Sequence, residues 1–468
     1  MNALAKILPW PADEADQLGL ALWDAVEIAR AVRGVAVGQF QVSGVEIDSR
    51  DVIPGDLFFA LKGEAMDGHK FVPMAFARGA AAVVVDRPVD GPHILVNDTS
   101  TALELLATAA RRRTGARIIG VTGSVGKTGV KEAIFAALDR GSRGQAHRSV
   151  KSYNNHVGVP LSLARMPARA KYGIFEMGMN HAGEISYLTR IARPTVALVN
   201  NAQRAHLEGL GSIEAVAHAK GEIFEGLGQG GIAVLNADDS NVAIWRDLTV
   251  AHKTLSFGLD QAADVSAVIK NGNEITLRTP AGNATVSLQI PGRHNVMNAL
   301  AASAACLAAG ASLDAVVSGL TTYRGAKGRL QEKAGLRGAK IIDDSYNANP
   351  DSMRAAVDVL AQRSGKRVFV MGDMGEVGIS GHRFHEEIGR YAKSRGIDRL
   401  LCLGSLSVAA ADNFGRSGEH FACVEELIDT LRGQIDVGTT VLVKGSRFMR
   451  MERVVNALLV DKGEPHAA

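Results

Sequence analysis

The sequence predicts an α/β protein of three domains: a mixed α/β N-terminal domain, a central doubly wound parallel sheet, and a C-terminal Rossmann-like α/β domain. Three observations lead to this fold class. A chain of 468 residues is too long for one ordinary core. Short apolar runs alternate with helical stretches over most of its length, as parallel sheets with crossover helices require. One strand and helix, expected at 118–121 and 127–138, are joined by a glycine-rich turn.

The first domain is expected to cover residues 1–113 and to mix short strands with helices. Its strands are expected at 56–61 and 82–86, and its helices at 71–79 and 101–113. Thr114 and Gly115 follow the last helix and predict a linker.

The second domain is expected over 114–325 and the third over 326–468, both with alternating strands and helices. In the second, strands are expected at 118–121, 174–177, 196–200 and 232–236, helices at 127–138, 185–192, 213–227 and 296–309, and a hairpin within 274–290. In the third, strands are expected at 340–343, 367–371, 400–403 and 440–443, with helices between them. This order favours two parallel sheets.

Composition excludes several classes of function. The net charge is only +3, from 52 basic and 49 acidic residues, so we expect no nucleic-acid partner. No apolar run reaches the length of a membrane span, and the first residues lack the basic start of a signal peptide. Three cysteines lie far apart in apolar contexts, as reduced buried thiols do. We therefore expect a cytoplasmic protein with no membrane insertion.

The glycine-rich turn predicts a phosphate-binding loop at Gly123, Ser124, Val125, Gly126, Lys127 and Thr128. Glycines let backbone N–H groups close around phosphate oxygens, and the start of the following helix adds partial positive charge. Lys127 would bridge the β- and γ-phosphates, and the Thr128 hydroxyl would contact Mg²⁺. Val121 stands where the general motif has glycine, so the shorter Gly-x-x-Gly-Lys-Thr pattern indicates a subclass of ATP users. The alternative is a turn with an incidental lysine.

Polar residues after other predicted strands are candidates for the same site. Glu176 ends an apolar strand, where a carboxylate can hold a metal near bound phosphates; a solvated acid is the alternative. His206 follows the next strand, although a loop histidine is most often a surface residue. Lys220 lies within a helix, and taken alone it would be a surface lysine.

Two further groups could contact a nucleotide. Asn295 and Asn298 are three residues apart at a helix start, so both amides share one face and suit an adenine edge. The alternative is a helix N-cap at Asn295. Arg329 and the acids of 343–350 lie just past the expected domain boundary, where they could close over a nucleotide. The Asn-Ala-Asn-Pro part of that run is also ordinary turn chemistry.

With these motifs in order, the chain resembles the ATP-dependent Mur ligases of peptidoglycan synthesis. The resemblance covers nearly the whole chain. Its motifs are Asp48-Ser-Arg50, Pro54-Gly-Asp-Leu-Phe58, Asp67-Gly-His69, Gly123-x-x-Gly-Lys-Thr128, Asn154-Asn-x-x-Gly158, Glu176-Met-Gly, His206-Leu-Glu, Ala219-Lys-Gly-Glu222, Gly292-x-His-Asn-x-x-Asn298, Asp344-Ser-Tyr-Asn-Ala-Asn-Pro350, Gly372-Asp-Met-Gly-Glu376 with His385, and Lys444-Gly-Ser-Arg447. The chain departs from the family pattern at Gly129, where the family usually has Thr or Ser.

The resemblance implies a role for each matching residue. Lys127 and Thr128 would hold the ATP phosphates and one Mg²⁺, and Glu176 with His206 would ligate a second Mg²⁺. Lys220 matches a lysine that is carbamylated in several family members, and it would help to place that metal. The remaining roles are adenine contacts from Asn295 and Asn298, ATP contacts from Arg329 and Asp344 after domain closure, UDP contacts near Asp48, Ser49 and Arg50, and substrate contacts from Asn154, Asn155, Asn347 and Asn349. Lys127, Lys220, His206 and Arg329 are the expected catalytic residues.

The resemblance also implies a reaction and its partners. It is strongest to the branch of the family that joins D-alanyl-D-alanine to UDP-N-acetylmuramoyl-tripeptide through an acyl phosphate, releasing ADP and phosphate, and a monomer is expected. The alternative branch adds a diamino acid to the dipeptide precursor, but its Asp-Asn-Pro-Arg pattern is absent, and the chain has 347-Asn-Ala-Asn-Pro-Asp-351. A nucleotide-driven switch or motor is a rival from another class, though no Asn-Lys-x-Asp motif is present. A non-catalytic nucleotide-binding module is the third alternative.

Overall fold

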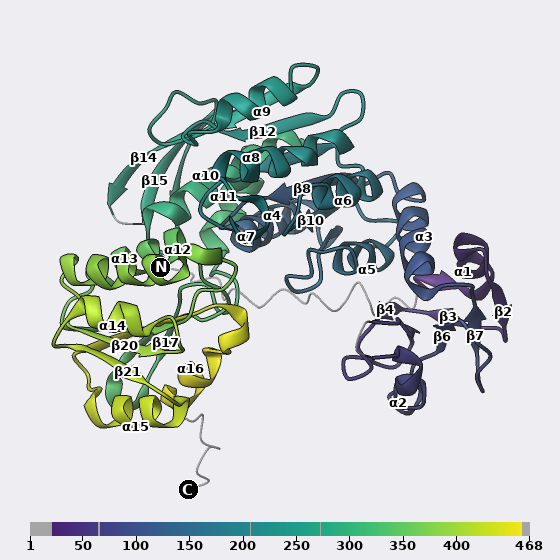
Figure 1. Cartoon of the computed structure of the whole chain (residues 1–468). Coiled ribbons are helices and arrows are strands. Elements are labelled where there is room, and N and C mark those ends of the chain that lie inside the picture. Colours follow the sequence, from purple (N-terminus) through teal and green to yellow (C-terminus); the bar gives the residue numbers. More distant parts are fainter. Residues whose placement is uncertain (1–20, 64–65, 206, 272, 461–468) are drawn as a thin grey trace, which may run out of the picture.

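The structure is a computed structural model that describes residues 21–63, 66–205, 207–271 and 273–460. Three α/β units follow one another along the chain, each with its own main sheet. In Figure 1 the middle unit, in teal, lies above the other two. The N-terminal unit, in purple and dark blue, is at the lower right, and the C-terminal unit, in green and yellow, is at the lower left. The predicted α/β class with three domains is confirmed.

The N-terminal unit has a five-stranded sheet of order β2-β7-β6-β5-β4 and a two-stranded ribbon, β1-β3. Its strands are β1 Trp23–Asp24, β2 Val35–Val37, β3 Gln41–Val42, β4 Gly44–Glu46, β5 Asp56–Phe59, β6 Ala82–Val85 and β7 His93–Leu95, and its helices are α1 Ala25–Val32, α2 Val72–Ala77 and α3 Thr99–Arg112. Every residue of β5 and β6 is buried, which explains why their apolar runs could be recognised in the sequence.

The middle unit is a six-stranded parallel sheet of order β13-β12-β11-β8-β10-β9. Its strands are β8 Arg117–Thr122, β9 Ala146–Arg148, β10 Tyr172–Glu176, β11 Val196–Val199, β12 Ile232–Asn236 and β13 Lys253–Phe257. Its helices are α4 Lys127–Ser142, α5 Gly158–Ala164, α6 Glu184–Ala192, α7 Leu207–Leu210, α8 Ile213–Gly221, α9 Val242–Leu248, α10 Arg293–Ala308 and α11 Leu313–Thr322. Because β8 lies between β10 and β11, the chain order reverses there, and ligands bind at such a switch point.

Two expectations for the middle unit need correction. The helix expected over 213–227 ends at Gly221 and continues as a 3₁₀ turn over Glu222–Gly226, since glycine weakens a helix. The hairpin expected within 274–290 is part of a three-stranded antiparallel sheet, β14 Ser266–Asn271, β15 Glu274–Thr279 and β16 Gly282–Ser287. Most of β14 is exposed, so it lacks the alternation of apolar and polar residues that marks a half-buried strand.

The C-terminal unit has a six-stranded sheet of order β17-β18-β22-β19-β20-β21, with β17 as an antiparallel edge strand. Its strands are β17 Gln331–Ala334, β18 Lys340–Asp344, β19 Lys366–Gly372, β20 Arg399–Leu403, β21 Gly418–Phe421 and β22 Thr439–Lys444. Its helices are α12 Pro350–Ala361, α13 Gly381–Ser394, α14 Val408–Phe414, α15 Val424–Gln434 and α16 Glu452–Leu458. Helices α12 and α13 lie on the side that faces the middle unit (Figure 1).

The apolar cores join the three units unequally. Leu161 and Ala164 of α5 belong to the same cluster as Trp23 and Leu57 of the N-terminal unit, so these two units share a core. The Trp23 indole also donates a hydrogen bond of 2.9 Å to the Ala164 carbonyl. By contrast, the two clusters of the C-terminal unit contain, among the described residues, only positions from 330 onward. No apolar cluster therefore joins the described residues of the middle and C-terminal units.

Two further expectations can be compared with the described residues. No helix in this part of the chain is long and apolar enough to cross a membrane. Cys306, Cys402 and Cys423 are all free, and Cys306 and Cys402 are buried as predicted, whereas Cys423 is only partly buried.

Candidate active site

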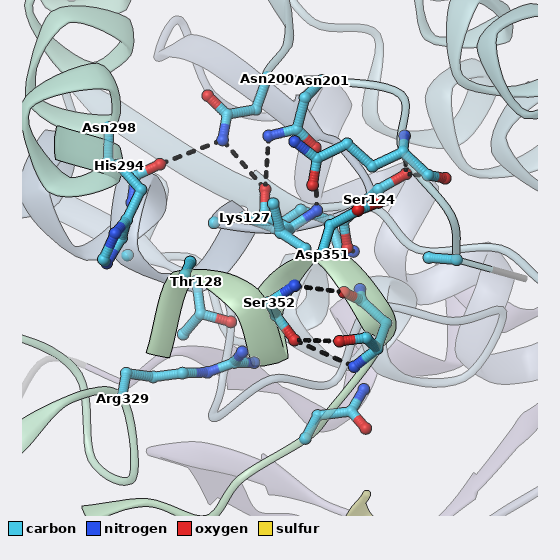
Figure 2. Close-up of a pocket in the computed structure, with 18 of the residues that line it drawn as sticks. Ser124, Lys127, Thr128, Asn200, Asn201, His294, Asn298, Arg329, Asp351 and Ser352 are labelled. Carbon is cyan, nitrogen blue, oxygen red and sulfur yellow. Dashed lines mark hydrogen bonds between the residues drawn. The ribbon is translucent and has the colours of Figure 1, made fainter. Parts of the chain in front are cut away.

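A cavity of about 650 Å³ lies at the carboxyl end of β8, between the middle and C-terminal units. The middle unit contributes the glycine-rich turn, Glu176 and the start of α10 to its lining. The C-terminal unit contributes Arg329, Asp344 and the 347–349 turn. Figure 2 shows side chains of both units around the same space. The fold thus brings residues more than 200 positions apart in sequence onto one cavity, as a ligand shared by two domains requires.

The turn at 123–128 has the backbone of a phosphate-binding loop. Gly126 is the N-cap of α4 and has φ +81°, a left-handed conformation that favours glycine. A Cβ on Gly126 would lie 2.6 Å from Nδ2 of Asn200 and would also collide with Oδ1 of Asn298. Because α4 starts at Lys127, its free N–H groups point toward the cavity.

Two asparagines that follow β11 hold this loop in place. The Val125 N–H donates to Oδ1 of Asn201 at 2.9 Å, and Nδ2 of Asn200 donates to the Val125 carbonyl at 3.0 Å. Nδ2 of Asn200 also reaches Oδ1 of Asn298 at 3.1 Å (Figure 2). Sequence reasoning did not find this support, and the available signal was that Asn200 and Asn201 directly follow a buried strand.

Lys127 is held back against its own loop. Its Nζ donates to the Gly123 carbonyl at 2.6 Å. Burial lowers the pKa of Lys127, while the nearby carboxylate of Glu176 raises it. A phosphate anion placed in the loop would offer this ammonium a better partner than a carbonyl does.

Thr128 and Glu176 form one polar unit at the base of the cavity. The Thr128 hydroxyl donates to one oxygen of Glu176 at 2.9 Å, and the Asn154 amide donates to the other at 2.8 Å. Glu176 is only 1% exposed. A hydroxyl and a buried carboxylate beside a phosphate loop are the oxygen ligands that Mg²⁺ prefers, so these residues fit the implied metal. Among the described residues, no group of three or more His, Cys, Asp or Glu side chains converges as a metal site.

Lys220 is fully buried, contrary to what its helix position alone predicts. Its Nζ makes no hydrogen bond within the described part of the chain. Burial, together with the charge of Lys127, lowers the pKa of Lys220 well below its ordinary value. An unpaired buried ammonium is costly, and burial therefore favours the neutral form of this amine. His206, the other predicted residue of this group, lies outside the described residues.

Asn295 and Asn298 both line the cavity on the first turns of α10. The N-cap of α10 is Gly292, so the alternative of an N-cap at Asn295 is wrong. Nδ2 of Asn295 donates to the Pro291 carbonyl at 2.7 Å. The two amides are 3.5 Å apart, from Nδ2 of Asn298 to Oδ1 of Asn295, and this places them on one face as predicted.

Arg329 reaches the cavity from the far side. Its guanidinium stacks 4.4 Å from the centroid of the Tyr346 ring, and its Nε is buried without a hydrogen-bond partner among the described residues. A buried N–H of this kind fits an anionic ligand. Asp344 also lines the cavity, but its carboxylate binds Nζ of Lys444 at 2.6 Å and the Leu330 N–H at 3.2 Å. Asp344 therefore contributes through an ion pair that sequence analysis did not find.

Three predicted substrate contacts have structural roles as well. Oδ1 of Asn155 accepts from the Gly158 N–H at 2.9 Å just before α5, and Asn349 is the N-cap of α12, where it forms a reciprocal capping pair with Ser352. The Asn347 carbonyl accepts a hydrogen bond of 2.9 Å from Lys444. All three asparagines line the cavity, so capping does not remove them from the site.

The predicted UDP-contacting residues do not line this cavity. Asp48, Ser49 and Arg50 lie in the loop between β4 and β5 of the N-terminal unit. The Arg50 guanidinium hydrogen-bonds the Asp48 carboxylate at 2.6 and 2.9 Å, and this lowers the pKa of Asp48 to about 2. Any role for these residues is therefore in a separate part of the molecule.

Glu376 is a cavity residue that the sequence did not single out for a role. It has φ +59°, a strained backbone for a residue with a side chain, and such strain is concentrated at functional sites. The preceding N–H groups are fixed: Met374 donates to Nε2 of His385 at 3.0 Å, and Gly375 donates to Oγ of Ser446 at 2.8 Å. The 372–376 and 444–447 motifs thus build one wall of the cavity together.

A phosphate-binding loop that faces a second α/β unit across a polar cavity defines a nucleotide-using enzyme of the ligase type. Profiles of the Mur ligase family match the chain at three places: its catalytic domain at 41–114, its middle domain at 121–306 and its glutamate ligase domain at 328–447. The chain belongs to the Mur ligase family.

Several relatives within that family carry one name. It is 44% identical to UDP-N-acetylmuramoyl-tripeptide–D-alanyl-D-alanine ligase of Escherichia coli, over 89% of this chain and 94% of the relative. Among solved structures, MurF from Acinetobacter baumannii has a TM-score of 0.83 at 35% identity, covering 93% of this chain and 99% of that one. MurF ligase from Thermotoga maritima in complex with ADP has a TM-score of 0.73 at 26% identity, covering 89% and 97%.

Proposed function

We propose that this chain is an ATP-dependent ligase that joins D-alanyl-D-alanine to UDP-N-acetylmuramoyl-tripeptide and releases ADP and phosphate. The relatives that carry this name match it over most of both chains. The single observation that carries the proposal is the shared cavity, where a phosphate-binding loop of one unit faces Arg329 of another. A switch or motor protein needs a nucleotide site, but it does not need polar groups of a second domain that line the same cavity.

The chemistry explains the need for two walls. A carboxylate is a poor electrophile, so its oxygen first attacks the γ-phosphorus of ATP, and the bond from that phosphorus to ADP breaks. The amine of the dipeptide, after losing a proton, then attacks the acyl carbon, and phosphate leaves with one oxygen of the original carboxylate. Lys127 and Arg329 offset the repulsion between two anions and stabilise the charge of phosphoryl transfer. Enclosure between the units keeps water from the acyl phosphate.

The metal is part of the same proposal. Thr128 and Glu176 would hold Mg²⁺, with His206 as a further ligand, and the ion would neutralise charge on the phosphate oxygens. The Lys220 amine is buried without a hydrogen-bond partner among the described residues and its pKa is lowered, which supports carbamylation because only a neutral amine adds to CO₂. The product, formed with loss of a proton, is a carbamate. Its negatively charged carboxylate group would lie beside the metal.

The remaining roles follow the position of each group. Asn295 and Asn298 would contact adenine, and Asp344 would act near the ribose or phosphates through its pair with Lys444. Asn154, Asn155, Asn347 and Asn349 would contact the ligation substrates. Asp48, Ser49 and Arg50 would bind the UDP end, and we keep residues 113/114 and 325/326 as the proposed domain boundaries.

An oxygen-transfer experiment tests this function. UDP-N-acetylmuramoyl-tripeptide with ¹⁸O in the carboxylate to be ligated is incubated with ATP, Mg²⁺ and either D-alanyl-D-alanine or a free diamino acid. We expect label in the released phosphate and turnover with the dipeptide only. Absence of label would overturn the acyl-phosphate step. A parallel reaction contains the UDP-linked dipeptide precursor and the diamino acid, and turnover there would instead support the alternative branch.

A further inference from the structure

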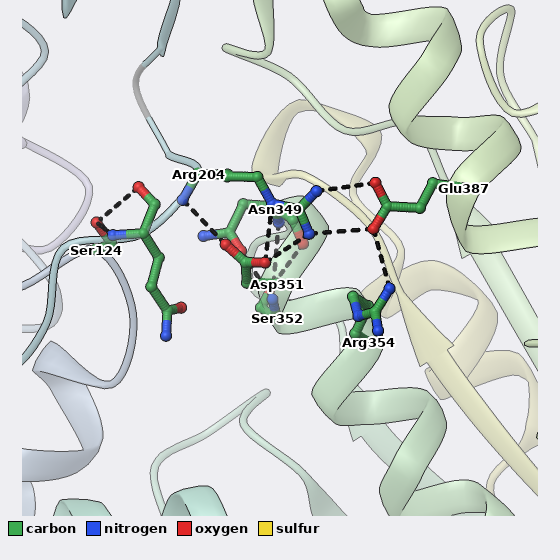
Figure 3. A network of polar contacts seen from close by, with 8 residues as sticks. Ser124, Arg204, Asn349, Asp351, Ser352, Arg354 and Glu387 are labelled. Atoms are coloured by element: carbon green, nitrogen blue, oxygen red, sulfur yellow. Dashed lines mark hydrogen bonds and ion pairs between the residues drawn. The ribbon is translucent and has the colours of Figure 1, made fainter. Parts of the chain in front are cut away.

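One side chain of the middle unit forms ion pairs with two helices of the C-terminal unit. Arg204 lies in the 200–205 loop that follows β11. Its backbone N–H, Nε and Nη2 all donate to the Asp351 carboxylate, at 2.9, 3.0 and 2.6 Å. Its Nη1 and Nη2 donate to the Glu387 carboxylate at 2.8 and 3.1 Å. Figure 3 shows this network, with Asp351 at the start of α12 and Glu387 on α13.

The network is more enclosed than an ordinary surface ion pair. The side chains of Arg204, Asp351 and Glu387 are 24%, 25% and 28% exposed. Burial alone would lower the pKa of Arg204, but the hydrogen bonds that it donates to Glu387 and Asp351 raise it overall. The Arg204 hydrogen bond in turn lowers the pKa of Glu387. Arg204 and Glu387 therefore stay charged near neutral pH, and forked guanidinium–carboxylate contacts of this kind are strong and directional.

The other end of the same loop holds the phosphate-binding turn. The Ser124 N–H donates to the Asn201 carbonyl at 3.0 Å. The Gln203 N–H donates to Oγ of Ser124 at 2.9 Å, and that hydroxyl donates back to the Gln203 carbonyl at 3.3 Å. Gln203 is next to Arg204 in the chain. A displacement of Arg204 is therefore transmitted within one residue to the turn that receives the phosphates.

The Arg204 contact is important because the interface between the middle and C-terminal units has no shared apolar core in the part of the chain that the structure describes. No apolar cluster joins the described residues of the middle and C-terminal units. An interface of that kind permits relative motion, and charged contacts decide which arrangement is favoured. The 200–205 loop is thus anchored on both sides, on one side to the C-terminal unit and on the other to the phosphate-binding turn.

We propose that Arg204 is a positioning residue that couples closure of the C-terminal unit to the shape of the phosphate-binding turn. When Asp351 and Glu387 engage Arg204, the 200–205 loop is fixed and its hydrogen bonds set Ser124 and Val125. When the C-terminal unit moves away, the anchor is lost and the turn is free to relax. Phosphoryl transfer is then favoured only in the enclosed state. This inference rests on the proposed ligase function.

A matched set of variants separates coupling from simple stabilisation. Arg204→Gln removes the charge that spans the units. Arg354→Gln is the control, because Arg354 also donates to Glu387, at 3.1 Å, but both residues belong to the C-terminal unit. Arg204→Lys keeps the charge without the forked geometry. Glu387→Gln weakens the contact from the opposite side.

We expect Arg204→Gln to lower kcat for ligation about tenfold while the Kd for an ATP analogue with Mg²⁺ changes by less than about threefold. Arg204→Lys should restore part of the loss, and Arg354→Gln should stay within about twofold of the parent. The double variant Arg204→Gln with Glu387→Gln should lose little more than Arg204→Gln alone, because both changes break one contact. A purely structural role would lower the melting temperature without this split between kcat and Kd.

Small-angle X-ray scattering of the full chain gives a test that does not need ligation. With an unreactive ATP analogue, Mg²⁺ and the UDP-linked precursor at saturation, we expect the parent and Arg354→Gln to contract, and Arg204→Gln and Glu387→Gln to remain more extended. Equal contraction and equal kcat in Arg204→Gln and Arg354→Gln would overturn the proposal. If the parent fails to ligate in every donor assay, the proposed function is wrong, while the scattering comparison still decides the role of Arg204.

Discussion

At the scale of single residues, Lys220 shows how a buried amine without a hydrogen-bond partner costs stability. Its amine is fully buried and has no hydrogen-bond partner among the described residues, and its pKa lies well below 10.5 because of burial and the charge of Lys127. Between the lowered pKa of the folded chain and 10.5, the unfolded chain binds more protons at this group than the folded chain does. The lysine therefore destabilises the fold at pH values below 10.5, and this cost fades as pH rises toward 10.5.

We predict that Lys220→Met abolishes ligation and also stabilises the chain at pH 7, by about 1–3 kcal/mol in bicarbonate-free buffer. The control is Lys131→Met. Lys131 is equally buried, but its Nζ donates to the Lys151 carbonyl at 2.6 Å and pairs with Glu132 at 3.1 Å, so its loss should destabilise. Denaturant unfolding at pH 7 and pH 10 measures the stability change in each of the two variants, and a ligation assay measures the activity. A Lys220→Met chain less stable than its parent at pH 7 would contradict the argument.

Sequence reasoning found the site residues whose motif is local. Gly126, Lys127 and Thr128 are recognisable because six adjacent residues make the phosphate-binding turn. Asn200 and Asn201 could not be found in this way, because their partner, Val125, is 75 or more positions away and contact depends on the pairing of β8 with β11. The roles assigned to Glu176, Lys220 and Arg329 through family resemblance stay predictions, although all three are buried or lie at the cavity.

At the scale of elements, the strand–turn–helix of β8 and α4 depends on a glycine for two separate reasons. Gly126 has φ +81°, and a side chain there would also collide with Asn200 and Asn298. Gly144 has a similar φ of +79° at the far end of α4, but a Cβ there would meet nothing within 4 Å. The two positions separate backbone strain from steric exclusion.

We predict that Gly126→Ala and Gly144→Ala each destabilise the chain by about 1–2 kcal/mol, the cost of a left-handed residue. Gly126→Ala should in addition weaken nucleotide binding at least about tenfold, since Asn298 and Asn200 must move. Isothermal titration with an ATP analogue measures binding, and urea unfolding measures stability. Equal nucleotide affinity in the two variants would show that the close packing at Gly126 is not required.

Elements were predictable where burial makes them apolar on both sides. The strands β10, β11, β12, β19 and β20 are almost wholly buried, and their runs were visible in the sequence. The strands β9, β13, β14, β17 and β21, which were not predicted, are edge or peripheral strands with partly exposed residues. Their position depends on neighbours in the sheet, and no local pattern records it.

At the scale of the whole molecule, the units differ in how they are joined. The N-terminal and middle units share an apolar cluster that includes Trp23 and Leu161. The described C-terminal unit has its own two clusters and meets the middle unit through Arg204 and the polar cavity. Unfolding of one unit is expected to spread to a unit that shares its apolar core. It is not expected to spread across the interface between the middle and C-terminal units, which has no shared apolar cluster among the described residues and which we call the polar seam.

We predict that calorimetry resolves two transitions, one for the N-terminal and middle units together and one for the C-terminal unit. An ATP analogue with Mg²⁺ should contact both bodies, so it should raise both transition temperatures and bring them closer together. At 100 times its Kd, the ligand should stabilise the chain by about 2.7 kcal/mol. Trp23→Ala should lower only the first transition. A separate melting of the N-terminal unit in the parent would show that the shared core does not couple it to the middle unit.

The polar seam has a consequence for the enzyme between turnovers. If two apolar faces separated each time the domains opened, an apolar patch would be exposed to other proteins, and such patches promote aggregation. Here separation uncovers charged groups and amides that water solvates readily, so the open form needs no protection while it waits for its next substrates.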